Sequence, residues 1–466
     1  MSVTLLTAWF LEALAVILVR HRLGRRWLRH PVTLVVLASA VYQGLSSALL
    51  TIPSFAAWNV FGIGIQPGFA DDAALLTSAA MLAFTIAYLA AAPERAAAAA
   101  DPEAVRAAAR VLDWRWLAAG CAPLAVLTYA GRGYNDAQAI GPGSPLSADL
   151  ASGFFVVLVT LTAFSFLLRH GTRWFLIVLA AQSAVLAAAG ERAPVAADAI
   201  ALILMLALAG RRPRRRQLSA AAVIALVAVL AITGLRAQQG RALFYTDSGL
   251  TGRLSALARG ITSLGAAPGQ PSIPVQFAER IDGTDFAAGV LQSVSAGQPR
   301  LSAAYVPGSL LLVVPSALWP AKLTHGDALQ LGTLEIDDFG LQHTNFLSGL
   351  PGLYVGFLSA PWLMAFLAFL GLLAGRAERW LFRRCTPVRL VLLAGAVESA
   401  LAYEQSLPGM LVQLRAAAAI AAVVKAAELA GRRRAWAGGT VASYAPLGAT
   451  GRLRQPTARS GRFSSE

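Results

Sequence analysis

The chain has 466 residues, of which 57% are hydrophobic and 14% are charged, against about 25% charged in a typical soluble protein. Apolar runs recur from Val3 to Ala430, which excludes a soluble globular protein and indicates one polytopic membrane domain over residues 1–437. The net charge of +15 does not indicate nucleic-acid binding, because the basic residues form short clusters between apolar segments. Such clusters are typical of the cytoplasmic loops of membrane proteins.

Eleven apolar segments approach the length of a membrane span, if tilt and boundary shifts of a few residues are allowed. They predict an all-α, polytopic transmembrane helix bundle of about 11 helices. The segments are residues 3–19, 32–52, 73–92, 116–130, 150–168, 174–189, 195–209, 218–235, 353–375, 390–403 and 410–430.

The arginines orient the predicted bundle. The loops after the first, seventh and ninth segments each carry five arginines, within residues 20–29, 211–216 and 376–389. Positively charged loops lie inside the cell, so the N-terminus is predicted outside and the C-terminus in the cytoplasm. Residues 438–466 are rich in Gly, Ser, Thr and Arg and are predicted to form a disordered cytoplasmic tail.

One long connection, residues 236–352, is then predicted to form a large external loop region containing short interfacial helices. Residues 254–264 have the apolar spacing of such a helix. Residues 303–319 are apolar enough to span, but prolines interrupt them, and a further span would move the arginines of residues 376–389 outside. We therefore expect a re-entrant or interfacial segment here. On the cytoplasmic side, residues 100–114 predict a surface helix capped by Asp101.

The histidines divide between the two faces. His21, His30 and His170 lie in basic loops, where contact with lipid headgroups is the expected role. His325 and His343 are the two that fall in the predicted external region. A single histidine at a helix entrance is usually a hydrogen-bonded interfacial residue, so the role of His343 depends on its neighbours.

Several ionisable residues accompany it near the outer ends of the predicted helices. They are Glu191, Arg192, Asp198, Arg236, Arg241, Glu398 and Arg415. An arginine within a bundle is costly unless it is paired or faces water, so Arg415 marks a candidate functional site. One interpretation is a buried ion pair of Arg415 with Glu398 or Asp198. The other is a cationic pocket for a phosphate-bearing lipid, since the arginine fork binds phosphate oxygens bidentately.

Other site signals are weaker. No Cys–His or paired-carboxylate spacing suggests a metal site, and no glycine-rich phosphate loop appears, so neither metal nor cofactor is expected. Asp71 and Asp72, before the predicted third helix, could be a catalytic acidic pair. Such residues more often stabilise a helix N-terminus through their charge.

Three stretches of the C-terminal half resemble the superfamily of O-antigen polymerases and ligases, in particular Wzy-type oligosaccharide repeat unit polymerases. "GER", from Gly190, is similar to the short Gly-x-Arg turn of the family. "VPSALWPAK", which ends at Lys322, resembles the external Trp-Pro-x-Lys element of the polymerase branch. "HTNFLSGLPGLYVGFLSAPWL", from His343, resembles a His-Asn-x-x-Leu entry to a glycine-rich helical pair. Departures from these patterns are the inserted Thr344, Ser316 after Pro315, and Leu323 after the lysine.

The resemblance implies transfer of an oligosaccharide from an undecaprenyl-diphosphate carrier to an acceptor glycan at the outer leaflet of the bacterial cell membrane, without nucleotide or metal. Carried over by position, His343 would be the base that activates the acceptor hydroxyl, and Arg192 would hold the diphosphate. Further candidate ligands are Lys322 in its motif and, by location, Arg236, Arg280 and Arg415. The implied partners are the lipid-linked donor, the acceptor glycan, the bilayer and a possible chain-length regulator, but no nucleic acid.

Two other functions remain open from the residues. A GT-C-type glycosyltransferase that uses a polyprenyl-phosphate sugar would place Asp71 or Asp72 in the catalytic role. A transporter of lipid-linked oligosaccharides, which is not an enzyme, predicts polar residues throughout the membrane depth. The sequence places them mostly near the outer face, which favours the enzyme.

Overall fold

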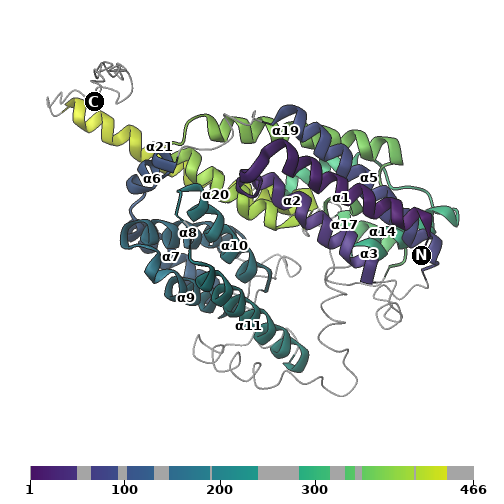
Figure 1. Ribbon diagram of the computed structural model, residues 1–466, viewed down its shortest axis with the longest axis horizontal. Helices are drawn as coiled ribbons and strands as arrows, with labels where there is room; N and C mark the ends of the chain where they lie inside the picture. Colours follow the sequence, from purple (N-terminus) through teal and green to yellow (C-terminus); the bar gives the residue numbers. More distant parts are fainter. Residues whose placement is uncertain are drawn as a thin grey trace, which may run out of the picture. The chain divides into compact units, whose positions relative to one another are not determined.

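A computed structural model describes residues 2–49, 65–92, 102–130, 146–188, 192–211, 213–239, 283–314, 331–341, 349–403 and 406–437. Within these ranges the secondary structure is entirely helical (Figure 1). Contacts divide the chain into two compact units, Met1–Ala422 and Val423–Glu466. The expected interfacial helix at residues 254–264 and the expected tail at residues 438–466 lie outside the described residues.

The first elements in chain order are α1 (Val3–Leu23), the 3-10 helix Gly24–Arg29, α2 (Pro31–Ser39), a π-helical turn (Ala40–Leu45), α3 (Ser46–Leu49), α5 (Pro67–Ala91), α6 (Pro102–Val111), α7 (Trp114–Ala130) and α8 (Leu146–His170). The next are the 3-10 turn Thr172–Trp174, α9 (Phe175–Ala188), α10 (Arg192–Leu208) and α11 (Arg215–Gln239). The last are α14 (Thr284–Ser295), α15 (Tyr305–Ser309), the 3-10 turn Leu310–Val313, α17 (Leu331–Asp338), α18 (Gly349–Gly352), α19 (Ala360–Arg383), α20 (Pro387–Leu401) and α21 (Ser406–Ala437).

Each of the eleven apolar segments overlaps a helix, but several predicted boundaries differ by more than a turn, most of all those of the ninth segment. The ninth segment was expected to begin at Leu353, whereas α19 begins at Ala360. Glycines and prolines at residues 349–361 favour turns, and Ser359 followed by Pro361 forms a favourable helix start. The apolar character of residues 353–357 therefore reflects burial in a turn.

Four helices are long and apolar enough to cross a membrane: Val3–Leu23, Pro67–Ala91, Ala360–Arg383 and residues Leu407–Ala430 of α21. Large apolar side chains on α1 are also exposed at helical spacing. Val3, Phe10 and Ile17 are 80%, 64% and 59% exposed. Residues seven positions apart share one face of a helix, so α1 presents a continuous apolar stripe. The stripe is the surface expected of a helix that contacts lipid, in keeping with a multi-pass membrane protein.

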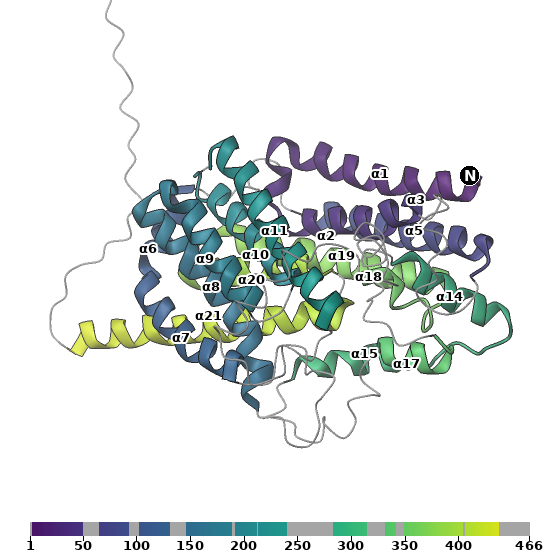
Figure 2. The same cartoon turned by 90° about the horizontal axis from the view of Figure 1, so that it is seen from below.

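The most extensive helix contacts join α5 to α1 and to α19 (Figures 1 and 2). Two glycines four residues apart, Gly371 and Gly375, allow α19 to lie against α5. A Cβ on Gly371 would lie 2.2 Å from the Phe84 carbonyl oxygen, and one on Gly375 would lie 2.7 Å from that of Tyr88. Small residues at this spacing let membrane helices pack backbone against backbone.

A second group of contacts joins α7 to α8 and connects α8, α9, α10, α11 and α20. Helix α6 covers part of α8 and α20, as expected for a surface helix with one apolar face. Its buried side chains are Val105, Ala108 and Ala109, spaced three and four residues apart. The predicted cap Asp101 lies outside the described residues.

Short helices fill the described parts of residues 283–358. Residues 303–314 contain only α15 and a 3-10 turn, nine residues of helix in all, where a span needs about 20. This length agrees with the expected re-entrant or interfacial segment, although residues 315–319 lie outside the described part. Helix α14 packs against α5, and the Gly283 N–H donates to the Tyr42 carbonyl at 3.2 Å.

Candidate functional site

The predicted site residues differ in how far the structure describes them. His343, Lys322 and Arg280 lie outside the described residues, as does His325. Arg192 is the first residue of α10 and Arg236 lies in the last turn of α11, but the described part does not extend to their side chains. Arg415, in α21, is described with its side chain.

Arg415 lies against the segment that leads into the second resemblance stretch. Its Nη1 donates a hydrogen bond to the carbonyl oxygen of Val313 at 3.0 Å, and its side chain is half-buried. Val313 ends the 3-10 turn and directly precedes Val314, where "VPSALWPAK" begins. The contact joins residues 102 positions apart, so the sequence could not show it.

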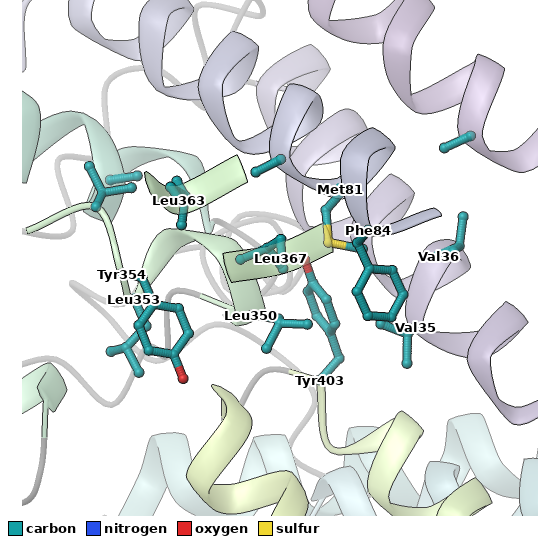
Figure 3. Close-up of a cluster of buried hydrophobic side chains, with 14 of the residues drawn as sticks. Val35, Val36, Met81, Phe84, Leu350, Leu353, Tyr354, Leu363, Leu367 and Tyr403 are labelled. Atoms are coloured by element: carbon teal, nitrogen blue, oxygen red, sulfur yellow. The ribbon is translucent and has the colours of Figure 1, made fainter. Parts of the chain in front are cut away.

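The described part of the third resemblance stretch begins at Gly349, which lies beside the end of α20. Gly349 has φ +71°, which favours glycine, and an added Cβ would lie 2.8 Å from the ring of Tyr403. The next residues, 350–357, are all buried. Figure 3 shows Leu350 and Tyr403 in one cluster of buried side chains with Phe84 and Leu367. This packing fixes the position of the chain six residues after His343.

The first resemblance stretch leads into α10, which a pair of carboxyls joins to α20. Asp198 and Glu398 hydrogen-bond to each other and are 0% and 3% exposed. Gln182 Nε2 donates to Asp198 Oδ2 at 3.1 Å, and Thr160 Oγ1 donates to Glu398 Oε1 at 3.0 Å. One interpretation of the sequence paired Arg415 with one of these carboxyls, whereas the partners that the described residues provide are Gln182, Thr160 and the other carboxyl. Asp198 also lies nearly two turns into α10, where one turn was expected, because the helix begins at Arg192.

Elements that adjoin or contain parts of the three resemblance stretches thus contact one region, residues 398–403 and 406–415, which we call the α20–α21 corner. Ser399 Oγ donates to the Met410 carbonyl at 2.8 Å across it. A Cβ added to Gly395 would lie 2.1 Å from the Cβ of Ala417, so α20 and α21 are also in close contact next to the corner. Glu398 connects the corner to α10, Tyr403 to Gly349, and Arg415 to Val313.

Two further side chains, which the sequence analysis did not single out, hold residues 355–358 in place. Arg300 donates to the carbonyls of Val355 and Leu358, the latter at 3.2 Å. The Gly356 N–H donates to Glu335 Oε1 at 2.9 Å. Burial raises the pKa of the Glu335 carboxyl well above its ordinary value, and burial lowers the pKa of Arg300. Charged residues between apolar segments gave no local signal of these long-range contacts.

The expected headgroup contact of His30 was wrong. His30 is 1% exposed, and its Nδ1 hydrogen-bonds to Oε1 of the buried Glu378 in α19. Tyr88 of α5 donates to the same oxygen at 3.1 Å. The prediction was wrong because His30 is the residue before Pro31 at the start of α2, where its side chain is buried rather than exposed with the basic loop.

A polar cluster within the helices was also missed. Glu12, midway along α1, is 3% exposed and accepts a hydrogen bond from Ser39 at 3.0 Å. Gln43, in the π-helical turn, accepts from Thr77 and Thr284 at 3.4 Å each. π-Helical turns often occur at functional sites. Glu12 was detectable as a single acidic residue within an apolar segment, which is itself a functional signal.

Asp71 and Asp72 do not lie before a helix as expected. Helix α5 begins at Pro67, which places both residues in its second turn, with Asp72 exposed. Within the described ranges, no group of three or more His, Cys, Asp or Glu residues is arranged to hold a metal ion.

Comparisons with known proteins found no family model, no curated protein and no solved structure that matches this chain.

Proposed function

We propose that this chain is a Wzy-type membrane polymerase that transfers oligosaccharide repeat units from an undecaprenyl-diphosphate carrier to an acceptor glycan at the outer leaflet. The observation that carries the proposal is the contact of the α20–α21 corner with elements next to all three resemblance stretches. Glu398, Tyr403 and Arg415 each contact an element that begins or ends at one stretch. Residues that act on one substrate must converge in this way, although their motifs lie far apart in the sequence.

The proposed topology has eleven spans, with the N-terminus outside, the C-terminus in the cytoplasm and an external region over residues 236–352. The charge distribution of the loops supports this orientation. The short helices at residues 284–313 are consistent with a region that does not cross the membrane. The corner then lies near the outer surface, where a lipid-linked donor presents its diphosphate.

The proposed chemistry uses a base and fixed cations. His343 accepts the proton of the acceptor hydroxyl, whose oxygen attacks the anomeric carbon as the bond to the carrier diphosphate breaks. Arg192 and Arg415 meet the charge that develops on the leaving diphosphate, with Lys322, Arg236 and Arg280 as further ligands. Arg415 suits this role because it is half-buried and its Nη1 is already oriented by the Val313 carbonyl.

A chain-length analysis tests the proposal in cells. A strain that lacks this protein should lose long surface glycans and retain single repeat units, and the wild-type gene should restore them. Retention of long chains in the deletion strain contradicts the proposal.

A second candidate, transport of a lipid-linked oligosaccharide, gains support from the buried polar residues. Glu12, Thr160 and Gln182 are 3%, 0% and 5% exposed and lie midway along α1, α8 and α9. Polar groups therefore occur at mid-helix as well as near the helix ends, contrary to the sequence-based expectation. Loss of single repeat units from the outer leaflet, together with the long chains, would favour transport over polymerisation.

A further inference from the structure

The carboxyl pair Asp198–Glu398 lies inside a bundle of four helices. Helix α10 contributes Asp198, α20 contributes Glu398, and α8 and α9 contribute Thr160 and Gln182. All four side chains are at most 5% exposed. Figures 1 and 2 both show these helices side by side, in agreement with their contacts.

Within the described part of the chain, the side chains that interact with the two carboxyls are polar or acidic. The side chains acting on Asp198 are Gln182, Glu398 and Thr160, and those acting on Glu398 are Asp198 and Thr160. Helix α11 and the 3-10 helix Gly24–Arg29 also pack on α10, but none of their described residues acts on either carboxyl. Two adjacent carboxylates in an apolar interior repel each other strongly, so a cation must neutralise them.

Buried oxygen atoms beside the pair point to a bound cation. Gln182 donates through Nε2 to both Asp198 and Thr160, which places its amide within the cluster. Its Oε1 and the Oδ1 of Asp198 are buried and have no hydrogen-bond donor in the described part of the chain. Unpaired buried acceptors are costly, and a cation that accepts oxygen ligands would satisfy them.

We propose that Asp198, Glu398, Gln182 and Thr160 form a buried site for one small monovalent cation, either a proton or Na⁺. A proton shared between the two carboxyls reduces the net charge of the pair from −2 to −1. A bound Na⁺ would reduce it equally and would be coordinated by the same oxygen atoms. The occupied site holds α10 against α20. This proposal does not depend on the polymerase activity.

Cation binding to the purified full-length protein tests the proposal directly. Binding of ²²Na⁺ is measured in detergent at pH values on both sides of neutrality. A Na⁺ site predicts saturable binding of one ion per chain, lost in Asp198→Asn and in Glu398→Gln. Asp72→Asn is the matched control, because this carboxyl is exposed on α5, and it should bind like the wild type. Thr160→Val keeps the side-chain volume, so it guards against loss of folding and should weaken binding about tenfold.

A proton site predicts no Na⁺ binding and a protonated-carboxyl infrared signal that is weaker in the double variant Asp198→Asn/Glu398→Gln than in the wild type, and unchanged in Asp72→Asn. No Na⁺ binding together with an unchanged infrared signal in the double variant, or binding of Ca²⁺ in place of a monovalent ion, would overturn the proposal.

Discussion

Replacement of Gly371 by alanine tests the contact between α5 and α19. The new methyl carbon would lie 2.2 Å from the Phe84 carbonyl oxygen and 3.1 Å from the Tyr88 nitrogen. Comfortable contacts between such atoms are about 3.5 Å, so the two helices must separate locally by about 1 Å. The obstructing atoms belong to a helix backbone and cannot rotate away.

The expected cost follows from this separation. A gap of about 0.5–1 Å removes a quarter to a half of the dispersion energy of each contact across it. Overpacking of this kind typically costs about 1–3 kcal/mol, and alanine recovers up to about 1 kcal/mol through its higher helix propensity. Gly120→Ala is the matched control. It also lies within a helix, but its new methyl would be an ordinary 3.8 Å from a Leu158 methyl group.

The assay is unfolding of the purified protein by titration of a denaturing detergent. Gly371→Ala should be less stable than Gly120→Ala by about 1–3 kcal/mol. Equal stability of the two variants would refute the close packing of these helices.

The remaining predictions concern charged groups. Burial raises the pKa of Glu335 above its ordinary value of 4.5, so its stabilisation is complete below that value and is lost as the pH rises through the raised pKa. Glu335→Gln should therefore reduce the fall in unfolding midpoint with rising pH, and an unchanged pH profile contradicts this assignment. Glu378→Ala leaves His30 buried without its hydrogen-bond partner and should cost about 1–3 kcal/mol in detergent titration, so wild-type stability would show that the pair is unimportant. Arg415→Lys keeps the charge but loses the fork, and should lower polymer yield at unchanged membrane abundance, whereas Asp72→Ala should leave the yield intact. Full yield with the lysine variant would argue against the proposed role of Arg415. Loss of yield with the Asp72 variant would argue for the GT-C alternative.

The helices themselves were largely predictable from the sequence. Long apolar runs permit few other structures, so the expected segment 116–130 corresponds to α7 (Trp114–Ala130) within two residues. The surface helix α6 was equally clear from Asp101 and Pro102, which are typical of a helix start. The predicted start of the ninth segment was wrong because apolar residues occur in a buried turn as well as in a membrane span, and hydropathy does not distinguish the two.

The contacts between helices could not be predicted. His30 and Glu378 are 348 positions apart, and nothing near either residue indicates the other. One of the two interpretations of the sequence paired Asp198 or Glu398 with Arg415, whereas in the structure Asp198 hydrogen-bonds to Glu398. Such pairings depend on how the helices rotate and cross, which hydropathy and charge patterns leave undetermined. The roles of Arg192, Arg236, Arg280, Lys322 and His343 remain predictions.

The central claim, polymerisation with His343 as the base, is tested most directly with purified protein and an undecaprenyl-diphosphate-linked oligosaccharide. The wild type should convert the donor into products of two or more repeat units without added nucleotide or metal. His343→Ala should lower the rate about 10²–10⁴-fold at equal protein level and equal donor binding, while His325→Ala should have a milder effect. Absence of elongation by the wild type would contradict the polymerase, and near-normal turnover by His343→Ala would remove this histidine from the reaction.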